Sequence, residues 1–271
     1  MTAQSSPNTP LLFTPTKLRG LEIRNRIMAS PMCQYHSDDG GPNDWHMMHL
    51  GRLAIGGCGI VFGEETAVEP DGRKTHSCAG LYNQSHIAAY RRLTDMIKQH
   101  GAVPAIQLGH SGRKGSCHGA IEDWRPLTAE DAKNSLPPWQ IMTPSAAISP
   151  PRPIPPKEMD QDDIKRVIEA FRTATKRSID AGYDIVEIHG AHGYLIHQFL
   201  SSSANQRDDT YGGSLENRMR FAVEVGAAVR EEWPQDKPVF FRLSAVDGKG
   251  GSWRLKDSIA LAKALRVVDI D

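Results

Sequence analysis

The 271-residue sequence lacks a net charge, paired cysteines and any apolar run long enough to cross a membrane. Its 32 basic and 32 acidic residues cancel, which argues against a nucleic acid or an anionic membrane as a partner. The four cysteines show no C-x-x-C pair and no zinc-like spacing, so neither disulfides nor structural zinc are expected. Residues 1–10 contain no hydrophobic signal core, and a cytoplasmic location is therefore expected.

Predicted strands and helices alternate strictly along the chain. This order argues for a parallel sheet with helices outside it. The predicted strands are Arg26–Met32, Cys58–Val68, Ala102–His110, Tyr183–His189, Val239–Ala245 and Val267–Ile270, and the helices follow at 45–56, 85–100, 160–181, 217–233 and 255–266.

A Gly-rich phosphate turn is also missing after the first predicted strand, where a dinucleotide-binding open sheet would need one. Polar Gln107, His189 and Arg242 each lie late in a strand, as in the carboxyl-end face of a barrel. We therefore predict an α/β fold, with residues 1–271 forming one (β/α)8 TIM-barrel domain that is truncated in or after strand six. Because an open barrel exposes a strand edge, either a longer polypeptide or a partner chain is expected to supply the rest.

The segment 111–160 is too long for a plain connection and carries nine of the 18 prolines. It leaves the third strand at the expected active-site end. Long irregular loops of this kind are frequently functional, so we predict that it caps a ligand, with a simple surface excursion as the alternative.

Two histidines and a tyrosine follow the apolar strand at 183–189. Alternation places Ile185, Glu187 and His189 on one face, and the glycines after the strand let the chain turn so that His192 approaches His189. Two neutral imidazoles can donate to one oxygen, and Tyr194 can act as an acid. A metal pair and two structural histidines are the alternatives that these residues leave open.

Several motifs in order across nearly the whole chain carry a family resemblance. They are Leu12-Phe13-Thr14-Pro15, Arg24-Asn25-Arg26-Ile27, Ser30-Pro31-Met32-Cys33-Gln34-Tyr35, Gln107–Lys114, His189-Gly190-Ala191-His192-Gly193-Tyr194 and Ser203–Arg218. With them the sequence resembles the Old Yellow Enzyme family of FMN-dependent ene-reductases. The combination of Cys33 and Tyr35 resembles its thermophilic-like (YqjM-like) subgroup.

The resemblance implies that FMN lies over the mouth of the barrel, against the segment that follows the first strand. Its contacts there would come from Ser30, Pro31, Met32 and Cys33. Cys33 would tune the flavin's redox potential; a buried, small apolar role is its alternative. Glu65 stands where the family usually has a small residue whose backbone meets the flavin. Its carboxylate is expected either to aim outward or to lower the flavin potential.

Gln107 is expected, from the same resemblance, to pair with the flavin pyrimidine edge through its amide. Arg242 would stabilise the negative charge of the reduced flavin. A structural ion pair between Arg242 and Glu187 is the alternative for that arginine. The loops that bind the FMN phosphate in the family follow strands seven and eight, which this sequence does not include.

The resemblance further assigns His189 and His192 to the carbonyl oxygen of an α,β-unsaturated substrate, Tyr194 to proton donation and Tyr35 to a hydrogen bond with the substrate. The reductant would be NADPH or NADH. Because members of the subgroup tend to form dimers or tetramers, the resemblance also predicts a homodimer or homotetramer. Two other functions remain open: the same flavoenzyme acting on nitro compounds or nitrate esters, and a flavin-free barrel fragment or binding protein. No metal is expected, because His189 and His192 lack a convincing third ligand such as His110 or His197.

Overall fold

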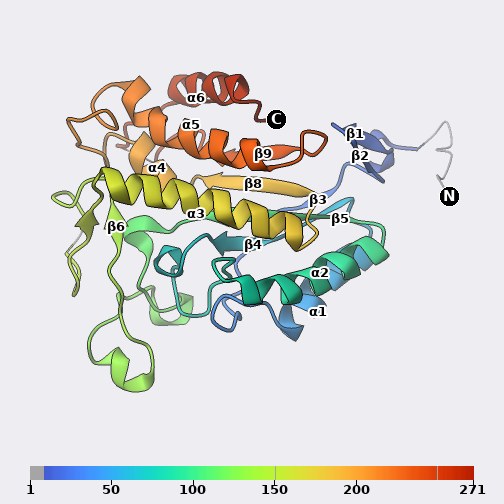
Figure 1. The fold of residues 1–271 in the computed structure, drawn as a ribbon, viewed down its shortest axis with the longest axis horizontal. Helices are drawn as coiled ribbons and strands as arrows, with labels where there is room; N and C mark the ends of the chain where they lie inside the picture. The colour runs from blue at the N-terminus through green and yellow to red at the C-terminus, as the bar shows by residue number, and fades with distance from the viewer. Residues whose placement is uncertain (1–8, 150, 249) are drawn as a thin grey trace.

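The computed structural model describes residues 9–149, 151–248 and 250–271. Its centre is a parallel sheet of five strands in the order β3-β4-β5-β8-β9. Helices lie below, in front of and above this sheet in the view of Figure 1, as around part of a barrel. The strands are β3 (Met28–Ala29), β4 (Ile60–Ala67), β5 (Val103–Gly109), β8 (Ile185–Gly190) and β9 (Val239–Leu243), and the helices α1 (Asp44–Ile55), α2 (Ile87–Gln99), α3 (Gln161–Asp180), α4 (Leu195–Leu200), α5 (Leu215–Glu232) and α6 (Leu255–Val267).

The five-stranded arrangement confirms the predicted barrel class. Each of the first five predicted strands and all five predicted helices are present, although the first strand shrinks to the two residues of β3. The short helix α4 and a hairpin of β1 (Thr16–Leu18) and β2 (Leu21–Ile23) were not predicted. The hairpin buries Ile23 against Ile60, Phe62, Ala105 and Ile185, so it closes the amino end of the barrel interior with an apolar layer.

The predicted sixth strand at Val267–Ile270 is wrong. Helix α6 continues through Val267, whose side chain is 85% exposed, and the chain then turns through Asp269, which has a φ of 62°. Only Asp271 reaches the edge of β9, where its backbone N–H donates to the Val239 carbonyl oxygen at 3.0 Å. A short apolar run fits a strand or a helix end equally well, and here Ile270 is buried against the outer core.

A polar layer lies above the apolar layer on the interior face. Register places Gln107 beside Glu187, and His189 beside Arg242. A one-residue irregularity in β4 between Phe62 and Glu65 shifts the pairing so that Glu65, not Glu64, stands beside Gln107. Because one extra residue turns the following side chains to the other face, this bulge brings a carboxylate into the interior.

The segment 111–160 begins at the carboxyl end of β5, opposite the β1–β2 hairpin, and the two lie at opposite ends of the molecule in Figure 1. Its secondary structure is limited to short turns and a two-stranded pair. These are η4 (Gly112–Lys114), η5 (Ala120–Glu122), η6 (Asp131–Asn134), β6 (Met142–Thr143) and β7 (Lys157–Glu158). Elsewhere in the described ranges, short 3-10 helices form at η1 (Leu11–Phe13), η2 (Pro70–Gly72) and η3 (Gln84–His86).

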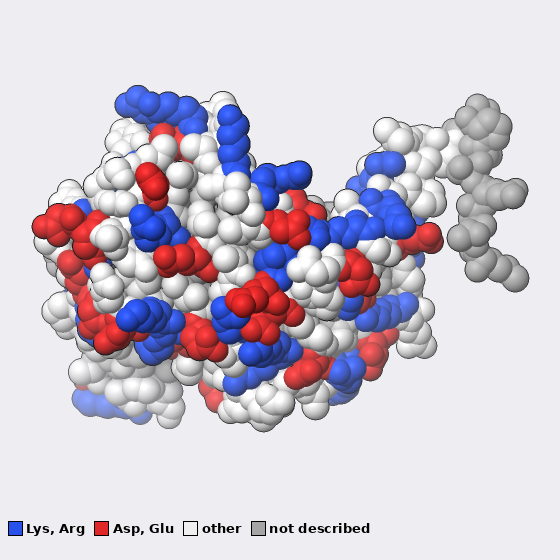
Figure 2. All heavy atoms as spheres, turned by 45° about the horizontal axis from the view of Figure 1, so that its top comes forward, with Lys and Arg blue, Asp and Glu red and all other residues white. Residues whose placement is uncertain are grey.

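Charges of both signs are interspersed on the face shown in Figure 2 rather than gathered into a patch of one sign. Among the residues that the structure describes, no helix has the length and apolar character needed to cross a membrane.

Candidate active site

The turn between β8 and α4 carries the histidine–tyrosine cluster. His192 (φ 58°) and Gly193 (φ 71°) both adopt the left-handed conformation, which folds the chain back sharply after the strand. The His192 backbone N–H donates to Ser244 Oγ at 3.0 Å, which ties the turn to the end of β9. Tyr194 then occupies the position that starts α4. The turn therefore holds all three side chains at the carboxyl end of the sheet.

The structure brings the two imidazoles into direct contact rather than leaving both free to bind one oxygen. His192 Nδ1 lies 3.2 Å from His189 Nε2, and His189 Nδ1 accepts from the Ala191 backbone N–H at 3.2 Å. In a neutral His189 the ring proton must then be on Nε2, which donates to His192 Nδ1. The proton of His192 is left on Nε2, the end of a two-ring donor chain.

Both histidines are neutral at neutral pH. Burial lowers the pKa of His189 to about 2, with the neighbouring His192 and Lys74 acting in the same direction. Burial also lowers the pKa of His192, and the positive charge of Arg242 adds to this effect. The pair can thus donate a hydrogen bond, through His192 Nε2–H, to an oxygen that gains negative charge, without itself carrying a charge beforehand.

Two tyrosines face one cavity of about 350 Å³ at the barrel mouth. Neither the Tyr35 nor the Tyr194 hydroxyl forms a hydrogen bond within the described part of the chain. Burial raises the pKa of both phenols, so both keep their protons at neutral pH. Trp124 of the 111–160 segment packs edge-on against Tyr35, with ring centroids 5.3 Å apart, and also lines the cavity. Trp124 of the long segment thus forms part of the cavity wall, and the predicted capping of a ligand stays a prediction.

Lys74 lies at the centre of this site and was not predicted from the sequence. It is only 3% exposed, and its ammonium pairs with Glu65 and lies 3.2 Å from Cys33 Sγ. Burial alone would lower the pKa of Lys74, but the Glu65 carboxylate and other neighbours raise it well above its usual value. The same ammonium lies 5.0 Å from the ring centre of Tyr194. Lys74 therefore lies between Cys33, which is on the expected cofactor side of the site, and Tyr194.

Neither expectation for Glu65 describes its environment completely. Its side chain points into the interior and is 4% exposed, but Lys74 balances its charge. The second carboxylate oxygen, Oε1, is buried without a hydrogen-bond partner among the described residues. Cys33, on the other side of Lys74, is half-buried, and burial raises the pKa of its thiol to about 11. The thiol is therefore protonated at neutral pH.

Gln107 and Arg242 stand on the same interior face but differ in their contacts. Gln107 Nε2 donates to Glu187 Oε1 at 2.6 Å, and burial raises the pKa of Glu187. Arg242, which is half-buried, forms no ion pair with any residue in the described ranges, including Glu187. Its cation is thus free to face an anion.

The segment after β3 contributes the side chains of Cys33 and Tyr35 to the site. Ser30 is exposed, Pro31 is half-buried and the Met32 side chain is 48% exposed. Tyr35 has a left-handed backbone with φ 55°, which turns its ring toward the cavity while Cys33 faces Lys74. The structure places these residues at the carboxyl end of β3, beside the cluster on β8.

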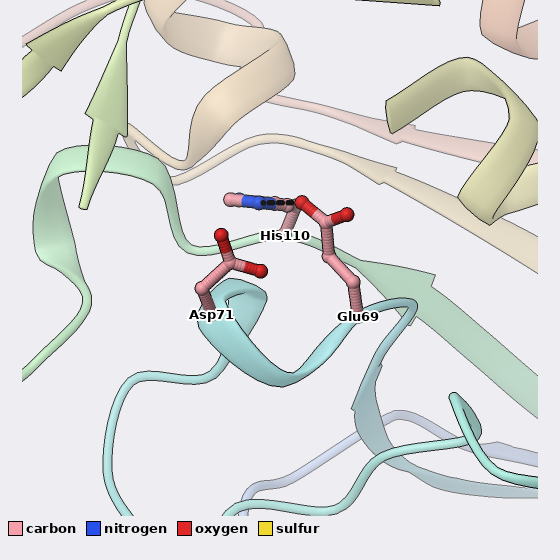
Figure 3. Close-up of side chains that lie close together, drawn as sticks. All are labelled: Glu69, Asp71 and His110. Carbon is pink, nitrogen blue, oxygen red and sulfur yellow. Dashed lines mark hydrogen bonds and ion pairs between the residues drawn. The ribbon is translucent and has the colours of Figure 1, made fainter. Parts of the chain in front are cut away.

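Glu69, Asp71 and His110 form a group whose ligand atoms lie within metal-binding distance of one another. Figure 3 shows His110 and Glu69 joined by a hydrogen bond, with Asp71 approaching from the η2 turn. The bond from His110 Nε2 to Glu69 Oε1 is 3.0 Å, and Arg166 pairs with the other Glu69 oxygen. Glu69, which precedes the η2 turn, is therefore already paired with Arg166 of α3 and bonded to His110.

A protein-family model described as "NADH:flavin oxidoreductase / NADH oxidase family" matches residues 11–269. The chain is 40% identical to an NADPH dehydrogenase of Geobacillus sp. (strain WCH70) over 263 residues, which cover 96% of this chain and 71% of the relative. Its fold matches the Old Yellow Enzyme homologue of Zymomonas mobilis with a TM-score of 0.80 and 25% identity, over 96% of this chain and 72% of that one.

A structure of 2-naphthoyl-CoA reductase with 2-naphthoyl-CoA matches with a TM-score of 0.83 and 30% identity, over 96% of this chain and 39% of that one. The chain thus spans under three quarters of each of these three proteins.

Proposed function

Because this chain belongs to the NADH:flavin oxidoreductase / NADH oxidase family, which includes the Old Yellow Enzymes, we propose that it reduces activated C=C bonds of α,β-unsaturated carbonyl compounds. The family assigns FMN as the cofactor and NADPH or NADH as the reductant. The observation that carries the substrate class is the pair of neutral, mutually bonded histidines beside an unpartnered tyrosine at the mouth of the barrel.

The interior face fits the flavin ring of FMN. Arg242 offers a cation that forms no ion pair among the described residues, and Gln107 offers an amide that can both donate and accept. The unpartnered Glu65 Oε1 is a buried acceptor that awaits a donor. Cys33 and the backbone of Ser30–Met32 would complete the contacts at the end of β3. When bound, FMN supplies the hydride for the reaction.

The chain's own residues would divide the remaining work. The His192 Nε2–H, oriented through His189, would donate to the substrate carbonyl oxygen and stabilise the charge that develops there. Tyr194 would deliver its proton to the α-carbon, since its phenol is protonated at neutral pH. Tyr35, which lines the same cavity and packs against Trp124, would also donate to the substrate.

Purified protein incubated with FMN and passed over a desalting column tests the cofactor, and NADPH oxidation with cyclohex-2-enone tests the reaction. We expect FMN to co-elute and the saturated ketone to form. Protein that retains no FMN, or holoprotein that oxidises NADPH without reducing the C=C bond, would contradict the proposal. Parallel assays with a nitro compound and a nitrate ester identify the alternative substrate classes.

A further inference from the structure

The cavity at the barrel mouth is lined by more positive charges than the nearby carboxylates neutralise. Three cationic side chains line it, Lys74, Lys114 and Arg152, and no Asp or Glu does. Glu65 balances Lys74. Neither Lys114 nor Arg152 forms an ion pair with any residue in the described ranges. Two cations therefore face one small cavity without a counter-charge.

Both cations are held in place by neutral groups that leave N–H donors free. Lys114 Nζ donates to the His192 carbonyl oxygen at 2.7 Å, and one guanidinium nitrogen of Arg152 donates to the Gly115 carbonyl oxygen at 2.5 Å. A second Arg152 nitrogen lies 3.1 Å from Cys117 Sγ. Because an ammonium carries three donors and a guanidinium five, each side chain retains capacity for a further acceptor.

The cations also lie next to the reactive groups. Lys114 Nζ is 5.4 Å from the ring centre of Tyr194, and the His192 carbonyl that it binds belongs to the turn carrying the histidine pair. Burial and the nearby charges of Arg113 and Lys74 lower the pKa of Lys114. An anion placed there would relieve this repulsion.

We propose that Lys114 and Arg152 bind a carboxylate of the acceptor substrate, so that the preferred acceptors are α,β-unsaturated carbonyl compounds bearing a carboxylate group. This inference rests on the proposed function and narrows its substrate class. Lys114 lies at the exposed rim and Arg152 is half-buried, so the interaction is partly screened by water. A charge-assisted hydrogen bond of about 1.5 kcal/mol still corresponds to roughly a tenfold preference.

A matched pair of acceptors tests the proposal: (E)-4-oxopent-2-enoate and its methyl ester, which share one carbon skeleton and differ in charge. FMN-loaded protein reduced with dithionite is mixed with each acceptor at pH 7.5, and flavin reoxidation is followed by stopped flow. The quantity compared is the ratio of second-order rate constants, acid over ester. General damage to the site lowers both constants together and leaves this ratio unchanged.

We expect Lys114→Gln and Arg152→Gln each to lower the acid-to-ester ratio about tenfold. Lys133→Gln, which removes an exposed lysine of the same long segment, should leave the ratio unchanged. Added salt should lower the ratio of the unaltered protein. A ratio that is the same in all variants would overturn the proposal. So would variants that lose only affinity for NADPH, because the cations would then serve the phosphates of the reductant.

Failure of the proposed function is recognised separately. If neither acceptor reoxidises the flavin, calorimetric titration of the oxidised protein with the same two compounds still measures the anion site. Tighter binding of the acid than of the ester, lost in Lys114→Gln and Arg152→Gln, supports the inference. Equal binding of acid and ester overturns it.

Discussion

Removing one partner of the buried Glu65–Lys74 pair should destabilise the protein strongly, whereas removing both should not. Both side chains are 4% exposed, so little water reaches either charge. Lys74→Met leaves a buried carboxylate unpaired, and Glu65→Gln leaves a buried ammonium unpaired. Breaking such a pair typically costs about 3–5 kcal/mol, while replacing both charges is often close to neutral.

A cost of this size is easy to measure. For a chain of this length, about 4 kcal/mol corresponds to a fall in melting temperature on the order of 10 °C. The single variants Lys74→Met and Glu65→Gln, their double variant and the unaltered protein complete a double-mutant cycle in thermal and urea unfolding. Lys133→Met is the control, because its pair with Glu130 is more than 70% exposed at both side chains and should be worth about 0–1 kcal/mol.

The pH of the measurement follows from the sign of the pKa shift. The pKa of Lys74 is raised in the folded protein, so the stabilisation is complete below the unfolded value of about 10.4 and is lost only as the pH rises through the raised value. Unfolding at pH 7.5 therefore reports the full interaction. Single variants that each cost under about 1 kcal/mol, with effects that simply add in the double variant, would refute a coupled buried pair.

Tyr194→Phe should lower the rate of C=C reduction by about 10²–10⁴-fold while leaving flavin reduction by NADPH unchanged; an equal loss in both half-reactions would show that the hydroxyl does not serve as the proton donor. Stability should fall on acidification from pH 7.5 to pH 5, because the pKa of His189 is held far below its unfolded value near 6.5 and only the unfolded chain gains the proton. His189→Gln should flatten this dependence by about 2 kcal/mol at pH 5 in urea unfolding, and an unchanged slope would contradict a buried neutral imidazole.

Much of the interior face follows from strand alternation. A strand shows its side chains to opposite faces in turn, so Glu187 and His189 had to share the face of Ile185. Because Gln107, His189 and Arg242 each lie late in a strand, the sequence predicted that they meet at the carboxyl end of a barrel. The structure places Gln107, His189 and Arg242 on that face. Local periodicity could not settle the end of the chain, where the predicted strand at Val267–Ile270 consists of the last residue of α6 and the three residues after it.

Other features depend on contacts between segments that are far apart in the sequence. The bulge in β4 places Glu65, rather than Glu64, beside Gln107 on the interior face. No pattern in the sequence predicted this bulge. Lys74 lies against Cys33 although 41 positions separate them in the sequence, and Trp124 of the long segment packs against Tyr35 of the segment after β3.

The sequence by itself thus determined the barrel class, the interior face and the identity of the histidine–tyrosine cluster, because these depend on local periodicity and on motifs that are read in order. Only the tertiary structure decided the charge balance of the site: which carboxylate turns inward, that Lys74 neutralises it, and that Lys114 and Arg152 have no ion-pair partner among the described residues. The physical reason is that electrostatic interactions depend on the distance between charges and on their burial. The order of residues in a loop does not set either quantity.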